Sequence, residues 1–414
     1  MTSKKPLFVI VLIVLIDLVG FTIVMPLLGP LARDYGLSGL RIGLLFSAYP
    51  LCQLVAGPIL GRLSDRYGRR PVLIFSQAGT ALSFLILGLT REFWVMLLAR
   101  ALDGASGGNI LVAQAYVADV TTPENRARGM GLIGMSFGLG FVLGPLLAGI
   151  LLEFPIAPEW RLRLPFLVAA GFSTLAWILV LTWLPESRDL AHKPRTSARI
   201  TTLAGVLHTL RTPKVAPLIA VASLVTLGFA ALEGTFSLYL RERLGWSDRA
   251  AAFGFAFLGT VSAFVQGGLI RRLVPKLGEP RLILAGLAIV VVGFLGMTQV
   301  VGTATLMAAT LCVGLGQGLV NPSLSGLISR LTPATDQGTV FGTLSSAATL
   351  ARMINYSVAN VMLTTWGPTA PFFEAASIAV CALILAVTTV LPWIKAHPAA
   401  TPAAHEPVAA TPES

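Results

Sequence analysis

The sequence is poor in charge and in cysteine. Only 12% of its 414 residues are Asp, Glu, Lys or Arg, against about 25% in a soluble domain. Its cysteines, Cys52, Cys312 and Cys381, lie far apart without metal-ligand spacing, so we expect small packing side chains and no metal site. A G-x-x-x-x-G-K-[ST] nucleotide loop and a catalytic triad are also absent, which argues against an ATP-driven pump or an enzyme, and we expect no cofactor.

The chain is instead rich in long apolar runs. Hydrophobic residues make up 55% of it and the mean hydropathy is +0.80. Stretches of about 18 to 25 such residues recur, each long enough to cross roughly 30 Å of hydrocarbon. We expect twelve membrane spans, at about 7–31, 42–61, 71–90, 93–118, 129–152, 164–185, 215–240, 250–270, 281–301, 303–329, 338–365 and 371–394.

The basic residues are distributed unevenly between the two sides of these spans. Of the thirty Lys and Arg residues, twenty fall in segments on the same side as the termini and eight in loops on the other side. Because positive loops stay inside, we expect a multi-pass protein of the plasma (inner) membrane with both termini cytoplasmic. This topology accounts for the net charge of +11 without a nucleic-acid partner.

A polar interruption divides the spans into six and six. We expect an N-terminal six-helix bundle at 1–185, a cytoplasmic linker at 186–214, a C-terminal six-helix bundle at 215–395 and a disordered cytoplasmic tail at 396–414. The halves resemble each other. The loop Gly268–Glu279 occupies the place that Gly61–Arg70 has in the first half, keeping the glycine and a basic pair but lacking the aspartate.

The loop Gly61–Arg70 reads G-R-L-S-D-R-Y-G-R-R. It resembles the signature G-x-L-[SA]-D-R-x-G-R-[RK] between the second and third helices of the major facilitator superfamily, and every specified position matches. The resemblance implies an all-α membrane protein with twelve transmembrane helices in two pseudo-symmetric six-helix bundles. It also implies a central cavity that opens alternately to each side, a small-molecule substrate, and a monomer in the lipid bilayer.

The same resemblance implies a gate at the cytoplasmic side. Asp65 would accept hydrogen bonds from a helix N-terminus of the second half near Gly338, and Arg69 would pair with Asp119. Together these contacts would hold the inner side shut while the outer side is open. In the alternative interpretation, the arginines of this loop are topological anchors only, at positions Arg62, Arg66 and Arg70.

The run G-F-V-L-G-P-L-L-A-G in span 129–152 contains Gly140, Gly144, Pro145 and Gly149. It resembles the G-x-x-x-G-P-x-x-G-G motif of antiporters of the family, with Ala148 in place of one glycine. Glycines four apart let two helices approach closely, and a proline kinks a helix. The motif predicts a hinge specific to export; the alternative is plain helix packing.

A lone charge within an apolar span is costly and marks a functional candidate, and we single out two such carboxylates. Asp17, in D-L-V-G-F-T-I-V-M-P, has a spacing similar to that of tetracycline/proton antiporters and their drug-exporting relatives. We expect it to bind a proton or cation, with a structural ion pair as the alternative. Glu233 is its counterpart in the second half and could carry the proton, attract a cationic substrate, or pair structurally with Arg352.

Arg100 opens the run R-A-L-D-G, which resembles the R-x-x-x-G motif implicated in proton coupling in the family. A fixed cation favours the ionised form of a nearby carboxylate, so moving the two apart would act as a switch. Alternatively, Asp103 neutralises Arg100 locally. Six amides could line the cavity or bridge helices, since buried amides need partners either way: Gln53, Asn109, Gln114, Gln317, Asn321 and Asn355.

The sequence departs from the tetracycline antiporters, which carry an aspartate in the third helix, a histidine in the eighth and an aspartate in the ninth. In this sequence the residue that resembles the third-helix position is Ser83. Residues 250–270 contain no histidine, and residues 281–301 contain no acid. We therefore predict a secondary active transporter for proton-coupled export of small amphipathic or cationic compounds, a multidrug efflux protein of the antibiotic-resistance type. The alternatives are a proton-coupled symporter for a sugar, peptide or organic acid, and a lipid-handling membrane protein.

Overall fold

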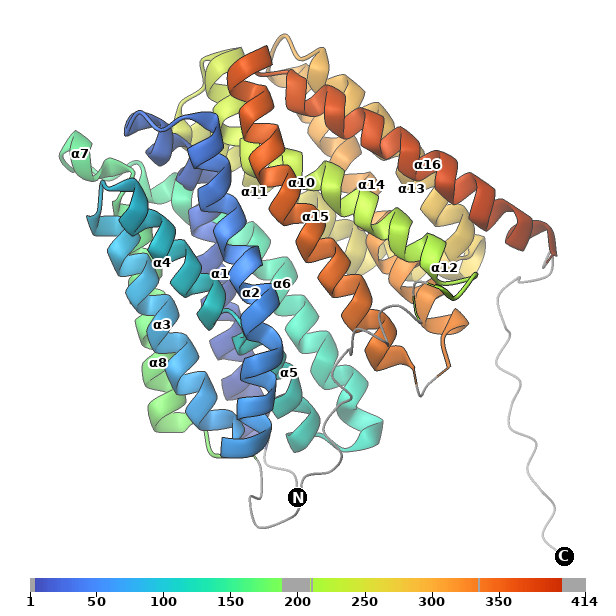
Figure 1. Cartoon of the computed structure of the whole chain (residues 1–414), viewed down its shortest axis with the longest axis horizontal. Helices are drawn as coiled ribbons and strands as arrows, with labels where there is room; N and C mark the ends of the chain where they lie inside the picture. Colours follow the sequence, from blue (N-terminus) through green and yellow to red (C-terminus); the bar gives the residue numbers. More distant parts are fainter. Residues whose placement is uncertain (1–3, 188–208, 210, 334–335, 397–414) are drawn as a thin grey trace, which may run out of the picture.

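The computed structural model describes residues 4–187, 209, 211–333 and 336–396. The described residues form helices, and their order separates two bundles, coloured blue to green and yellow to red in Figure 1. Most of the expected linker at 186–214, and the tail beyond residue 396, lie outside the described residues.

The first bundle contains six long segments and one short helix. Its fourth expected span, 93–118, is divided at Gly107 and Gly108, where the chain passes close to Tyr49 and Leu60 of the second helix. The helices are α1 (Lys4–Asp34), α2 (Gly39–Tyr67), α3 (Arg69–Leu89), α4 (Phe93–Ser106), α5 (Asn109–Val120), α6 (Pro123–Leu151), α7 (Pro158–Arg161) and α8 (Leu164–Trp183).

The second bundle also contains six long segments. Its second segment continues from one helix to the next through a π-helical turn, Val265–Leu269, instead of breaking. The helices are α10 (Ala216–Leu244), α11 (Asp248–Phe264), α12 (Ile270–Leu277), α13 (Glu279–Thr298), α14 (Thr303–Leu331), α15 (Gln337–Trp366) and α16 (Ala370–Ala396).

The expectation of twelve spans agrees with this helix inventory. Eleven spans of the described chain are long and apolar enough to cross a membrane. The remaining long helix, α15, has 30 residues but a more polar composition, because it packs between α2 of the first bundle and α10 and α16 of its own. The fold is all-α, with two six-helix bundles.

The two bundles touch at one end of the molecule, which we call the sealed end; it holds Asp34 and Leu244, the last residues of α1 and α10. There a single apolar cluster contains residues of both bundles, among them Phe46 and Phe236. At the opposite end, which we call the separated end, each bundle has its own cluster, one around Tyr116 and one around Leu324. In Figure 1 the bundles converge at the top and diverge toward the bottom.

One close approach at the sealed end is a seam between α2 and α15. Gly39 faces the Asn360 carbonyl, and a Cβ added at Gly43 would meet the Tyr356 carbonyl oxygen at 2.8 Å. Ser47, one turn further along α2, donates a hydrogen bond of 2.6 Å to the Met353 carbonyl. Because backbone lies directly against backbone here, neither glycine position has room for a side chain.

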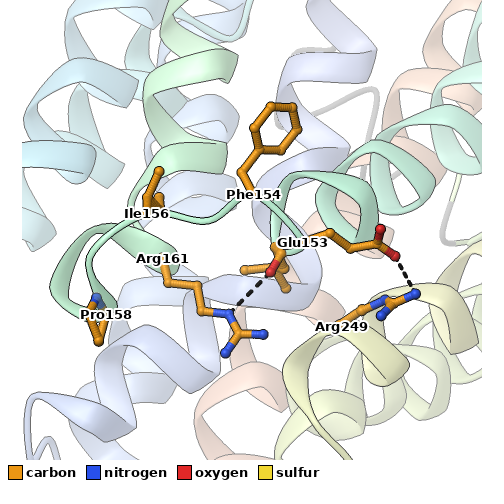
Figure 2. A pocket seen from close by; sticks show the side chains of 7 residues that line it. Glu153, Phe154, Ile156, Pro158, Arg161 and Arg249 are labelled. Atoms are coloured by element: carbon orange, nitrogen blue, oxygen red, sulfur yellow. Dashed lines mark hydrogen bonds and ion pairs between the residues drawn. The ribbon is translucent and has the colours of Figure 1, made fainter.

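Three ion pairs join the bundles around the same end. Arg33 lies 3.3 Å from Glu242, and Asp34 lies 2.8 Å from Arg241. The third pair joins Arg249 at the start of α11 to Glu153 after α6. Figure 2 shows this pair beside a surface pocket of about 430 Å³.

We predict that Gly43→Leu drives the bundles apart at the sealed end, because its side chain would need the space that the α15 backbone occupies. In a protein whose three cysteines are replaced by serine, spin labels at Leu40 and Trp366 would report a longer distance than in the parent. Gly171→Leu in α8 is the control, since an added Cβ there meets nothing within 4 Å. Unchanged distances in Gly43→Leu would show that the seam does not determine the closure.

Candidate functional site

The first bundle contains a buried polar cluster around Asp17 of α1. The Asn109 amide of α5 donates a hydrogen bond to Asp17 Oδ2, and Gln77 of α3 lies beside the same carboxyl group. Among the described residues, Asp17 Oδ1 has no hydrogen-bond partner, although only 8% of the residue is exposed. Only one of the two carboxyl oxygens here has a hydrogen-bond partner, so the site suits an acid that binds and releases a proton or cation.

The glycine-rich run of α6 packs directly behind this cluster. Gly140 faces Leu18, and Gly144 faces Thr22, whose hydroxyl donates a 2.7 Å hydrogen bond to the Gly140 carbonyl. The first two glycines therefore bring α6 against α1 one residue beyond Asp17. Gly149 faces Phe253 of α11 in the other bundle, and Pro145 lies inside α6. The run thus supports the acidic cluster and the seal together, whereas its role as a hinge stays a prediction.

Arg100 of α4 is buried and pairs with Asp103 at 2.7 Å. Its Nε donates to the Leu45 carbonyl at 3.3 Å, and its guanidinium lies 4.9 Å from the Tyr49 ring centre. The geometry is that of the local neutralisation considered as the alternative for Arg100. Asp103 also lies near enough to Asp17 to repel it, so the Arg100–Asp103 pair and Asp17 are electrostatic neighbours.

The second bundle contains a matching cluster around Glu233 of α10. Tyr356 of α15 donates a 2.9 Å hydrogen bond to Glu233 Oε2, and Arg352 Nε lies 3.5 Å from the same oxygen. Glu233 is thus buried with a cation and a hydroxyl, the pairing that was the structural alternative for this residue. The Tyr356 ring lies 5.5 Å from that of Phe46 on α2, so the cluster adjoins the first bundle.

The six candidate amides differ in their surroundings. Asn109 binds Asp17, as described above. Gln53 donates to the Tyr49 hydroxyl and to the Gly107 carbonyl, and Asn355 donates to the Leu227 carbonyl at 2.7 Å, so both bridge helices. Asn321 is exposed and donates to Gln317, whereas Gln114 is half-buried.

The gate residues of the first bundle are paired with one another. Arg69 lies 2.8 Å from Asp65 and 3.0 Å from Asp119. Gly338, the expected partner region of the second bundle, has nothing within 4 Å of an added Cβ. The contact between Asp65 and the start of α15, and its role as a latch, stay predictions.

Two gate features were missed from the sequence. Glu186 accepts hydrogen bonds from the backbone N–H groups of Arg69 and Arg70 and so caps the start of α3. In the second bundle Glu279, the first residue of α13, lies 2.9 Å from Arg330, the penultimate residue of α14. In the first bundle the basic Arg69 begins α3 and the acidic Asp119 is the penultimate residue of α5. In the second bundle the acid begins the equivalent helix and the base is near the end of the other, so the charges are exchanged.

The sequence analysis also missed Glu374 in α16, an acid within the expected span 371–394. Its signal was available, because any acid inside an apolar span is a candidate.

Among the described residues, no group of three or more His, Cys, Asp or Glu side chains could hold a metal ion.

Comparison with known proteins gives consistent matches. The family model described as Major Facilitator Superfamily matches residues 10–303 and 272–412. Over 389 residues, 92% of this chain and 96% of the relative, the chain is 30% identical to the tetracycline resistance protein, class C, of Escherichia coli. It is 27% identical to multidrug resistance protein 2 of Bacillus subtilis (strain 168), over 87% of this chain and 89% of the relative.

Solved structures give the same fold. The human organic anion transporter MFSD10 (TETRAN) matches with a TM-score of 0.68 at 26% identity, over 93% of this chain and all of that chain. The nucleoside transporter NupG matches with a TM-score of 0.75 at 12% identity, over 92% of this chain and 99% of that one, and supports the fold alone.

We predict that exchanging the charges of the Glu279–Arg330 pair preserves stability, whereas single changes do not. Glu279→Arg alone leaves two cations in contact at the start of α13 and should lower the free energy of unfolding by about 1 kcal/mol, the upper end for a partly exposed pair. Thermal unfolding in detergent should show a midpoint lowered by about 2–4 °C. The double variant with Arg330→Glu should recover most of this loss; equal loss in both would contradict a pairwise interaction.

Proposed function

Because this chain belongs to the Major Facilitator Superfamily, whose members are membrane transporters and not enzymes, we propose that it exports small amphipathic or cationic compounds in exchange for protons. The secondary-transporter assignment follows from the family and the fold. The direction, the coupling ion and the substrate class are our proposal, as are a monomeric state, a place in the plasma membrane and cytoplasmic termini.

The half-satisfied carboxyl group of Asp17 is the observation that carries the coupling proposal. Its Oδ1 has no partner and its Oδ2 has only amides for neighbours, so a bound proton or a cationic substrate would complete the site. The ion pair of Arg100 with Asp103 is an electrostatic neighbour of Asp17, so separating that pair would change the charge that Asp17 faces. Competition between a proton and a cation at one carboxyl group is a sufficient basis for exchange.

The relatives support export of drug-like compounds without naming the substrate here. Tetracycline resistance proteins and multidrug resistance protein 2 cover most of the chain at 27–30% identity. Ser83, the residue at the place of the third-helix aspartate of tetracycline antiporters, is buried and donates a 2.8 Å hydrogen bond to the Ala99 carbonyl. Since that hydroxyl has a structural partner and no charge, we do not propose tetracycline–metal exchange.

The second bundle would supply a cationic surface opposite Asp17. Arg352 has a side chain that is 45% exposed while it pairs with the buried Glu233, so the guanidinium group is the accessible member of the pair. A cationic substrate would displace Arg352 from Glu233, and return of Arg352 would release the substrate. In this cycle the contacts of the sealed end separate while the gate around Asp65, Arg69 and Asp119 closes the opposite end.

The proton gradient is a sufficient drive for this exchange. A potential of about 100 mV contributes about 2.3 kcal/mol for each charge that crosses, and one pH unit contributes about 1.4 kcal/mol. Together these amount to a substrate gradient of a few hundredfold for one proton. With cytoplasmic termini, the sealed end faces outward and the described conformation is open to the cytoplasm.

We predict that Asp17→Asn abolishes substrate-dependent proton flux. Purified protein in liposomes with an imposed pH gradient would receive a panel of lipophilic cations while internal pH is recorded. The wild type should show proton movement with some of them, and Asp17→Asn should show less than a tenth of it, because an amide cannot exchange a proton. Glu159→Gln in the exposed helix α7 removes one acid elsewhere and should retain the flux.

Two outcomes would count against this function. Flux that persists in Asp17→Asn would move the proton to another acid, Glu233 first. No flux with any cation, from wild-type protein that is monodisperse and unfolds cooperatively, would rule out cation export. Accumulation of a sugar, peptide or organic acid driven by the same gradient would then favour a symporter.

A further inference from the structure

Glu374 is a second incompletely satisfied carboxyl group, far along the chain from Asp17. It lies on α16, half-buried, and its Oε2 atom is buried without a hydrogen-bond partner among the described residues. The amide of Asn355 on α15 lies beside its carboxyl group. That amide also donates to the Leu227 carbonyl, so Glu374 lies where α10, α15 and α16 meet.

The depth of this position follows from the packing of α16 on α10. A Cβ added at Gly228 would lie 3.3 Å from the carbonyl oxygen of Ala375, the neighbour of Glu374. Gly228 is near the middle of α10, which runs from Ala216 to Leu244. Glu374, in the second turn of α16, therefore lies at the level of the middle of α10.

The charged groups of the helices packed against α16 have other partners. On α10 and α15, Glu233 pairs with Arg352, and on α13 the charges lie at the first turn, at the separated end. The titratable groups in the last turns of α10 are also engaged elsewhere: Tyr239 with the Met297 carbonyl, Arg241 with Asp34, Glu242 with Arg33, and Arg243 with the Val300 carbonyl.

Glu374 and Glu233 thus belong to one bundle but face opposite electrostatic surroundings. Glu233 has a cation and a hydroxyl, whereas Glu374 has a single amide and no cation within the described residues. An ionised carboxylate without a cation at this depth is costly, and a protonated one is not. The neutral acid can also donate its proton to the amide oxygen of Asn355, which satisfies both groups.

The site is connected to the seam between the bundles. Asn355 lies on α15 between Met353 and Ser357. The Met353 carbonyl and the Ser357 hydroxyl both contact Ser47 of α2, and the Ser357 backbone faces Gly43. Separation of α2 from α15 at the sealed end would free this stretch of α15 to move. Movement of Asn355 would change the polar surroundings of the Glu374 carboxyl group.

We propose that Glu374 is a second proton-binding residue of the transport cycle, which enters the conformation in which α15 is joined to α2 in its protonated form. The proposal rests on the proton coupling proposed above. The step is the formation of one O–H bond on the carboxyl group from a proton that water on the outer side supplies while α15 is apart from α2, and the return of that proton to water on the inner side once α15 has joined α2. Glu233, already paired with Arg352, then attracts substrate and carries no proton.

The test combines a spectroscopic and a transport measurement on the full-length protein in liposomes. Infrared difference spectra between acid and alkaline buffer should contain the C=O band of a protonated carboxylic acid that is lost in Glu374→Gln and retained in Glu159→Gln. The ratio of protons to substrate should fall by about one in Glu374→Gln. Its thermal midpoint at neutral pH should match the wild type, since glutamine is close in shape to the neutral acid.

Each failure is distinguishable from the others. An unchanged band together with a thermal midpoint lowered by several degrees would show that Glu374 is ionised and structural, which overturns the proposal. An unchanged proton-to-substrate ratio would overturn it as well. If the wild type shows no substrate-dependent proton flux, the proposed function fails, and the infrared band alone still decides whether Glu374 holds a proton. Glu374→Asp, which keeps the acid, should retain the band at a shifted position.

Discussion

The close contact of α2 with α15 is the constraint on which the described conformation depends. Two glycines and a serine let the α2 backbone lie directly against α15. The mixed apolar cluster and three ion pairs lie at the same end of the molecule, one of the pairs where α11 begins and α6 ends. The ion pairs are 30–49% exposed on their side chains, so each contributes at most about 1 kcal/mol. The seal therefore depends mainly on packing, and a side chain in the seam would weaken it more than any one charge.

The polar clusters are placed by the same helix contacts. Close approach of α6 to α1 at Gly140 and Gly144 fixes Asp17, and close approach of α15 to α10 fixes Glu233 and Asn355. Because α15 forms the seam and also contacts α10, opening the seal would change the surroundings of Glu233 and Asn355. This is the physical requirement for coupling: a two-state element whose equilibrium a bound proton and a bound substrate both influence.

The sequence predicted the spans because hydropathy over about 20 residues is a property of composition. It also predicted the pair of Arg69 with Asp119, which is present, and the choice of Asp17 as a buried acid. It did not distinguish coupling from local neutralisation at Arg100, because that depends on helix rotation, which places Asp103 at 2.7 Å. The break at Gly107–Gly108 was missed for a similar reason, since helices tolerate single glycines unless a neighbour such as Leu60 occupies the space.

The two halves illustrate why a missing motif residue is weak evidence of a missing function. The loop of the second half lacks the aspartate of the first, yet Glu279 and Arg330 form an ion pair at the equivalent helix ends with exchanged charges. Pseudo-symmetry conserves the position of the contact, whereas an ion pair remains attractive when its charges are exchanged. In the described state both pairs are satisfied within their own bundles. If closing the separated end exchanges these partners for others of similar energy, the two conformations would differ by little enough for one proton to change which is populated.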